Sequence, residues 1–188
     1  TKDINYNSDI KVNGPSLKIS LIQTAYEIYT TNIENLSNNS TYEDLYNNTS
    51  RDAKKHYKWL KKTYDSMNDD MKFKLKNIFD SNSSWSYTNS VINLDDNASV
   101  SDIVDTLISS KNLSLSSDLQ NDIYVFFNYF YNDYFKSYFN KEKPSLNKKA
   151  SKLNELLSSN DVDVKKFIEN VCGVTLSNDY ICTFYYSL

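Results

Sequence analysis

The stretch YVFFNYFYNDYFKSYF, residues 124–139, has ten aromatic residues among its sixteen positions and dominates the pattern of this 188-residue chain. At about 100° per residue, the apolar side chains from Leu119 onward cover roughly half of a helix circumference. Asparagine, aspartate and lysine side chains occupy the other half. The pattern predicts a long helix over 117–140, capped by Ser116 or Ser117.

Two roles stay open for this aromatic helix. So broad an apolar sector favours a central core helix with neighbours on two sides. The tyrosines suit a wet cleft or a partner surface as well, because each buried phenol needs a hydrogen-bond partner. Tyr131 and Tyr138 are therefore candidate interaction residues.

Apolar spacing and capping residues predict further helices along the chain. Ser16 caps a helix through about Asn35, although a short strand over 17–21 competes with its first turn. The Asn- and Ser-rich stretch 35–50 is typical of a loop. In 81–97 Trp85 and Tyr87 alternate, which predicts a strand or an extended loop. The other expected helices are 51–66, one starting at Asn68, one at Ser99, one at Pro144 and one from Asp161 to a left-handed Gly173.

These elements together predict a mainly α fold, an irregular multi-helix domain with a few short strands. Residues 1–15 are polar and lack periodicity, which indicates a flexible N-terminal arm ahead of one helical domain over 16–188. The chain starts without methionine, which suggests a processed start. Its end, 180–186, is an aromatic β-type run, which fits either a genuine C-terminal strand or a domain that is an incomplete part of a larger fold continuing past Leu188.

Composition excludes several classes of function. The chain has 2 glycines, 2 cysteines and 1 histidine, too few for a glycine-rich phosphate loop, a four-thiolate zinc site or a His-rich metal centre. We therefore expect no cofactor within this chain. The net charge is −3 and Arg51 is the sole arginine, which argues against nucleic acid as a partner. No apolar run is long enough to predict a membrane span.

The helix 51–66 carries one basic face, made of Lys54, Lys55, Lys58, Lys61 and Lys62. Trp59 flanks this face. The lysines and Trp59 together suit contact with an anionic surface such as phosphate. The alternative is a solvated helix face. His56 lies at the margin of the buried stripe. A hydrogen-bonded, half-buried histidine is the favoured interpretation, and a general base or a metal ligand is the alternative.

The two cysteines and the acidic pairs have structural interpretations. Cys172 and Cys182 flank an expected turn and form either a disulfide or two buried free thiols. The pairs Asp69-Asp70, Asp95-Asp96 and Asp161-x-Asp163 stand at expected turns or helix starts, where carboxylates accept hydrogen bonds from exposed N–H groups.

The order of these elements resembles a known family. The helices opening at Ser16 and Ser50, the segment with Trp85, the aromatic helix 124–139 and a later Val/Phe/Ile helix look like the N-terminal half of zincin-like peptidases exported by low-GC bacteria. The asparagine, lysine and tyrosine excess fits such an AT-rich source. The resemblance implies a zinc-binding H-E-x-x-H helix, which is absent here and would have to follow Leu188.

Two functional hypotheses follow. The resemblance implies a non-catalytic helical portion of such a peptidase, extracellular or in the cell envelope, that helps to form a substrate cleft. The alternative is an interaction module that binds a protein, peptide or glycan through aromatic side chains. Candidate interaction residues are His56, Trp59, Tyr131 and Tyr138.

Overall fold

The computed structural model describes residues 10–34, 50–159, 169–173, 175 and 182–185. This part of the chain is mainly helical, which confirms the predicted fold class. The chain divides into two compact units, each described here by itself. The helical unit is Ser16–Asn140, and the mixed unit combines Thr1–Pro15 with Lys141–Ser187.

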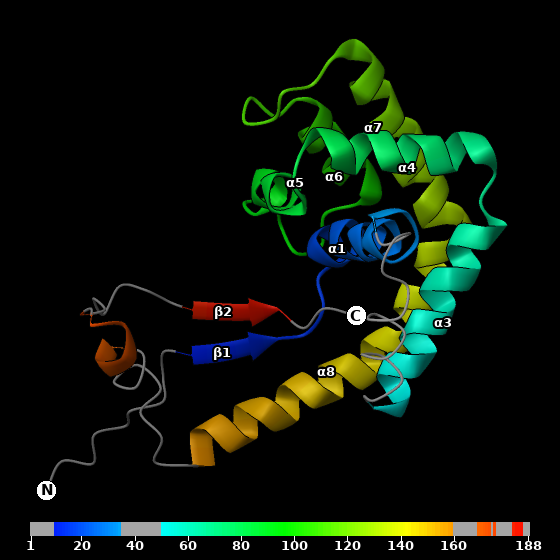
Figure 1. Cartoon of the computed structure of the whole chain (residues 1–188). Helices are drawn as coiled ribbons and strands as arrows, with labels where there is room; N and C mark the ends of the chain where they lie inside the picture. The colour runs from blue at the N-terminus through cyan, green and yellow to red at the C-terminus, as the bar shows by residue number, and fades with distance from the viewer. Residues whose placement is uncertain (1–9, 35–49, 160–168, 174, 176–181, 186–188) are drawn as a thin grey trace, which may run out of the picture. The chain divides into compact units, whose positions relative to one another are not determined.

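The helical unit is built from consecutive helices and two π-helical turns (Figure 1). In chain order they are α1 (Leu17–Tyr29), η1 (Thr30–Glu34), α3 (Arg51–Ser66), α4 (Asp69–Ser81), α5 (Ser84–Val91), α6 (Val100–Ile108), α7 (Ser117–Phe130), η2 (Tyr131–Phe135) and the start of α8 (Lys136–Ser159).

Several helices begin at the caps that the sequence predicts. Ser50 Oγ accepts a hydrogen bond from the Ala53 N–H at 3.2 Å, and Asn68 Oδ1 accepts one from the Met71 N–H at 2.8 Å. Ser99 forms a reciprocal capping box with Asp102, whose carboxyl pKa is lowered by the hydrogen bonds from Ser99. Ser16 caps α1 and Ser116 caps α7, each with a side-chain oxygen that accepts from a backbone N–H. Since α1 begins at Leu17, the strand alternative for 17–21 is wrong.

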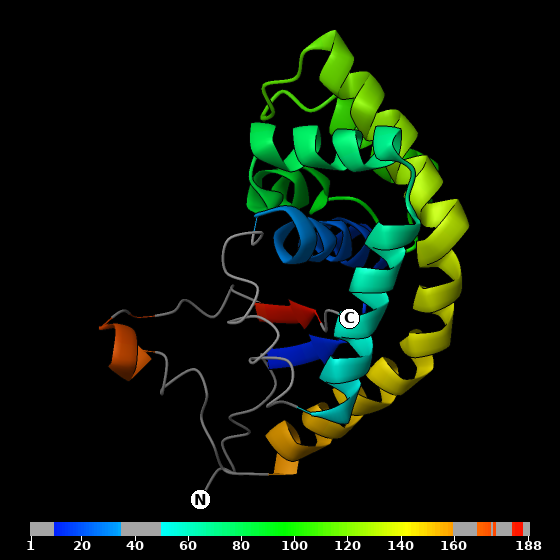
Figure 2. The same ribbon diagram turned by 45° about the vertical axis from the view of Figure 1, so that its right-hand side comes forward.

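The aromatic stretch supplies the centre of the core. α7 packs against α4 and α6, while α1 packs against α5, α3 and α4 (Figures 1 and 2). Phe126, Phe127, Phe130 and Phe135 are fully buried within one hydrophobic cluster. The core role of the stretch is therefore confirmed for its phenylalanines, while its tyrosines lie toward the rim.

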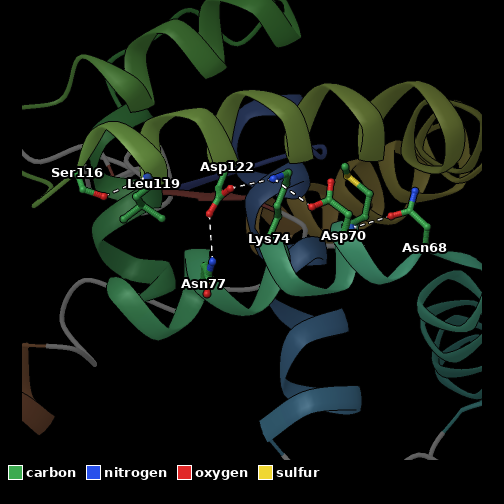
Figure 3. A network of polar contacts seen from close by, with 8 residues as sticks. Asn68, Asp70, Lys74, Asn77, Ser116, Leu119 and Asp122 are labelled. Atoms are coloured by element: carbon green, nitrogen blue, oxygen red, sulfur yellow. Dashed lines mark hydrogen bonds and ion pairs between the residues drawn. The ribbon is translucent and has the colours of Figure 1, made fainter.

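A buried carboxylate joins α4 to α7 (Figure 3). Asp122 of α7 accepts hydrogen bonds from Lys74 Nζ at 3.1 Å and from Asn77 Nδ2 at 3.2 Å. Lys74 also lies 3.4 Å from a carboxylate oxygen of Asp70, one turn earlier on α4. The hydrogen bond to Asp122 raises the pKa of Lys74, so the ammonium stays charged in its partly buried position.

The segment 81–97 is not a strand or an extended loop over its first half. It contains α5, capped by Ser83 Oγ, which accepts from the Ser86 N–H at 3.2 Å. Tyr87, Thr88 and Val91 form the buried face at helical spacing. Trp85 is 72% exposed, so its alternation with Tyr87 does not mark one face of a strand.

Pro144 does not open a separate helix. It lies inside α8, which continues from α7 and η2 without a break. Proline lacks the N–H that a helix interior needs, so the carbonyl of Asn140 loses its donor. Both Pro144 and Asn140 are exposed. Water can therefore satisfy the carbonyl, which makes the missing hydrogen bond tolerable.

In the described residues of the mixed unit, the short strands β1 (Ile10–Asn13) and β2 (Cys182–Tyr185) pair in parallel, in the register Ile10 to Cys182. The strand β1 corrects the expectation that its residues belong to a flexible arm. The Asn154 side chain donates to the Val12 carbonyl and accepts from the Val12 N–H, both at 2.7 Å. An amide on α8 thus takes the hydrogen-bonding place of a neighbouring strand.

Other expectations fall partly or wholly outside the described residues. The loop over 35–49, the helix start at Asp161 and the pair Asp161-x-Asp163 are outside them. The described end of that last helix, 169–172, is followed by Gly173 with φ of 64°, which confirms the left-handed glycine. The strand at the end of the chain is confirmed for 182–185.

Candidate functional site: the exposed face of helix α3

Helix α3 carries a basic face on the side opposite its buried stripe. Leu60 and Thr63 are buried in the helical unit, and α3 starts at Arg51 as the sequence predicts. On a helical wheel of about 100° per residue, six cations fall within a sector of about 120° centred opposite Leu60. We call this sector the basic face: Arg51, Lys54, Lys55, Lys58, Lys61 and Lys62, with the single acid Asp65.

The basic face is open to solvent and mostly free of ion pairs. All of its cations are exposed except Lys61, which is half-buried. Among the residues that the structure describes, Lys55 has an interaction partner, whereas Arg51, Lys54, Lys58, Lys61 and Lys62 take part in none of the ion pairs found, such as those of Lys18, Lys74 and Lys76. The face is therefore a concentration of positive charge in an acidic chain.

A hollow lies over the N-terminal half of this face. Its volume is about 500 Å³, and its lining is Arg51, Asp52, Lys54, Lys55 and Lys58. Four of the five lining side chains carry a positive charge at neutral pH. A small anionic group could enter the hollow and meet several of them at once.

The buried side of α3 is anchored by a polar cluster around His56. The Nε2 atom of His56 lies 2.7 Å from Glu27 Oε2 on α1, and its Nδ1 atom lies 2.7 Å from Tyr138 Oη on α8. The carboxylate only accepts, so Nε2 carries the proton in the neutral ring, and Nδ1 accepts the Tyr138 hydroxyl proton. His56 thus joins three helices.

Trp59 completes this arrangement, which we call the His56 cluster. Its ring stacks on that of Tyr138 with centroids 3.9 Å apart and planes 10° apart. The imidazole lies nearly parallel to both rings, at 6.3 Å from Trp59 and 5.9 Å from Tyr138. The structure therefore brings together three of the predicted interaction residues, His56, Trp59 and Tyr138. Trp59 and Tyr138 each have one ring face covered by the other.

The chemistry available to the cluster is limited by these contacts. The His56 side chain is 11% exposed and both of its ring nitrogens are engaged. A metal ligand needs a ring nitrogen whose lone pair is free, whereas here Nε2 faces the Glu27 carboxylate and Nδ1 already accepts from Tyr138. The favoured interpretation of His56, a hydrogen-bonded and partly buried side chain, is confirmed.

The remaining predicted residues lie elsewhere. Tyr131, in η2, is half-buried and packs against the hydrophobic core rather than on the His56 cluster. Cys172 has a free thiol and is exposed, which agrees with the unpaired alternative but not with burial. The side chain of Cys182 is outside the described part. Asp69 and Asp70 lie in the first turn of α4, and Asp96 pairs with Lys18 Nζ at 3.2 Å.

Sequence reasoning misses Glu27. It sits on α1, 29 positions before His56, and no local motif links the two. The one available signal is its place on a helix that is otherwise largely apolar, where a carboxylate beside buried residues needs a partner. Only the packing of α1 against α3 identifies that partner.

The described residues contain no group of three or more His, Cys, Asp or Glu side chains placed to hold a metal ion. None of the helices described is both long enough and apolar enough to cross a membrane.

Comparison with known proteins gives no match to this chain, whether with family models, with curated proteins or with solved structures. The resemblance to zincin-like peptidases and the extracellular location therefore stay predictions.

Proposed function

We propose that this chain is a binding module that holds an anionic partner on the basic face of α3. The observation that carries the proposal is the row of six cations on that face, five of them exposed, next to a hollow that Arg51, Lys54, Lys55 and Lys58 line. Cations gathered on one face create a local positive potential that attracts anionic ligands. The net charge of −3 is spread over the whole chain, and salt screens it beyond about 8–10 Å.

Charge supports this proposal better than the aromatic side chains support binding to a protein or glycan. Trp59 and Tyr138 stack on one another, so each already uses one ring face inside the molecule. His56 uses both nitrogens to fix α3 in place. The His56 cluster then serves to hold the basic face in a fixed orientation, and binding falls to the lysines.

Replacing charges on the basic face tests the proposal. In the triple variant Lys54→Gln, Lys58→Gln, Lys62→Gln we expect weaker binding to heparin, a sulfated polyanion used as probe, by tenfold or more. The control is Lys111→Gln, Lys136→Gln, Lys148→Gln, which removes the same charge from exposed lysines of other segments. Titration calorimetry at two salt concentrations measures both. Equal affinities of the two variants would refute the basic face as the binding surface.

The peptidase hypothesis stays a second proposal. It requires that the longer protein contain an H-E-x-x-H segment after Leu188, and that this protein bind zinc and hydrolyse peptides. A coding region without such a segment would remove it.

A further inference from the structure

We infer that the partner on the basic face is a linear phosphate polymer without bases, with inorganic polyphosphate as the simplest member. This inference rests on the proposed function and names the chemistry of its ligand. It follows from the spacing of the cations, from their chemical type and from the lack of aromatic rings and amides among the residues of the basic face.

The cations form a row along the helix axis rather than a single cluster. They recur once per turn, at Arg51, at Lys54 and Lys55, at Lys58, and at Lys61 and Lys62. At about 1.5 Å per residue, the row is about 16 Å long. A single phosphate could meet only the side chains around the hollow, whereas an extended polyanion along the axis meets the cations of all four levels. The row therefore fits a polymer.

The type of cation suits phosphate. Five of the six are lysines, whose ammonium is a compact point charge with rotatable donors. Lysine is a common ligand of phosphate as a point charge. The planar, two-pronged guanidinium, which suits carboxylate and phosphate alike, is offered by Arg51 alone.

The basic face offers no group that could bind a nucleic-acid base. Its seven residues are cations and Asp65, so it has no aromatic ring on which a base could stack and no amide to bind a base edge. The aromatic residues at the two margins are Trp59, which is stacked on Tyr138, and Tyr57, which is half-buried. A polymer that presents phosphate without bases loses nothing by this, in contrast to a single-stranded nucleic acid.

Four probes test the inference with the whole chain: long-chain polyphosphate, tripolyphosphate, poly-glutamate and an oligo-dT strand, compared at equal concentration of charge. We expect long polyphosphate to bind at least tenfold more tightly than each of the others. In the triple variant of Lys54, Lys58 and Lys62 the slope of log affinity against log salt should fall by about 2–3, roughly one for each lost contact. The control variant should keep the original slope.

The outcomes separate the two proposals. Poly-glutamate or oligo-dT binding as tightly as long polyphosphate, with the same loss in the triple variant, would overturn the phosphate inference and leave the anion-binding module intact. Tripolyphosphate binding as tightly as the long chain would overturn the polymer part. If no polyanion distinguishes the triple variant from the control, the proposed function itself fails.

Discussion

Tyr87 shows how a single buried phenol can make stability depend on pH. Its side chain is fully buried, and its hydroxyl donates to the Ile78 carbonyl at 2.7 Å. Burial raises the pKa of Tyr87 to about 12. The unfolded chain ionises this group near pH 10, so the stabilisation is present below pH 10 and is lost as the pH rises toward 12.

We therefore predict that Tyr87→Phe changes the alkaline limb of the stability curve. At neutral pH it should cost about 1 kcal/mol for the lost hydrogen bond. Above pH 10 this deficit should shrink, because the wild type alone loses up to about 1.4 kcal/mol per pH unit from this group. Urea unfolding from pH 7 to 11.5 measures both effects. Tyr124→Phe, at a side chain that is 54% exposed, is the control and should leave the stability curve unchanged. A curve for Tyr87→Phe that runs parallel to that of the wild type above pH 10 would contradict the argument.

The link between His56 and Glu27 is a second prediction about single residues. His56→Ala removes two hydrogen bonds of 2.7 Å and part of the aromatic stack, so we expect a loss of about 2 kcal/mol in the free energy of unfolding. A double-mutant cycle with Glu27→Ala isolates the pair, and its coupling energy should be about 1 kcal/mol. A coupling energy of zero would mean that the contact contributes nothing to stability.

Sequence reasoning works for residues whose partners are close in the chain. The caps at Ser50, Asn68 and Ser99 bond to backbone groups three residues away, so the local sequence identifies them. Glu27 and Asp122 bond across helix pairs, and the spacing of residues along one helix contains no information about the partner helix. The basic face was predictable, since it belongs to one helix, but its hollow was not.

At the scale of elements, the errors lie where one local signal is misleading. In 81–97 the alternation of Trp85 and Tyr87 predicts a strand or an extended loop, but the structure has a helix capped by Ser83, with Tyr87, Thr88 and Val91 on its buried face. Trp85 is exposed, which is uncommon for tryptophan, so its alternation with Tyr87 marks no common buried face. Pro144 is a second misleading signal. Proline is more frequent at a first helical turn than in an interior, so Pro144 predicts the start of a separate helix.

Pro144→Ala distinguishes the two descriptions of α8 by the sign of its effect. Inside a helix, alanine restores an N–H donor to the Asn140 carbonyl and removes a cost of about 3 kcal/mol. Helix content by circular dichroism should then rise, and amide exchange over 141–148 should slow. At the first turn of a separate helix the same change would bring no gain. Ser145→Ala serves as the control and should change either measurement only slightly.

At the scale of the whole molecule, the hydrophobic core lies within one unit. Every residue of the main buried cluster, from Leu21 to Phe139, falls inside Ser16–Asn140. The sequence predicts the mainly α class because helical periodicity is local. It does not predict the pairing of β1 with β2, since that contact joins residues about 170 positions apart in the chain.

We therefore predict that the fragment 16–140 folds on its own. It keeps the whole cluster and the His56 cluster with it, so its thermal unfolding should be cooperative and its circular dichroism helical. The matched control is the fragment 16–130, which lacks the buried Phe135 and Phe139 and also Tyr138. Loss of two buried phenylalanines costs several kcal/mol, with about 3–5 for each truncation in a core, so this shorter fragment should be unfolded or only loosely packed. A broad, non-cooperative transition of the fragment 16–140 would show that its core depends on the rest of the chain.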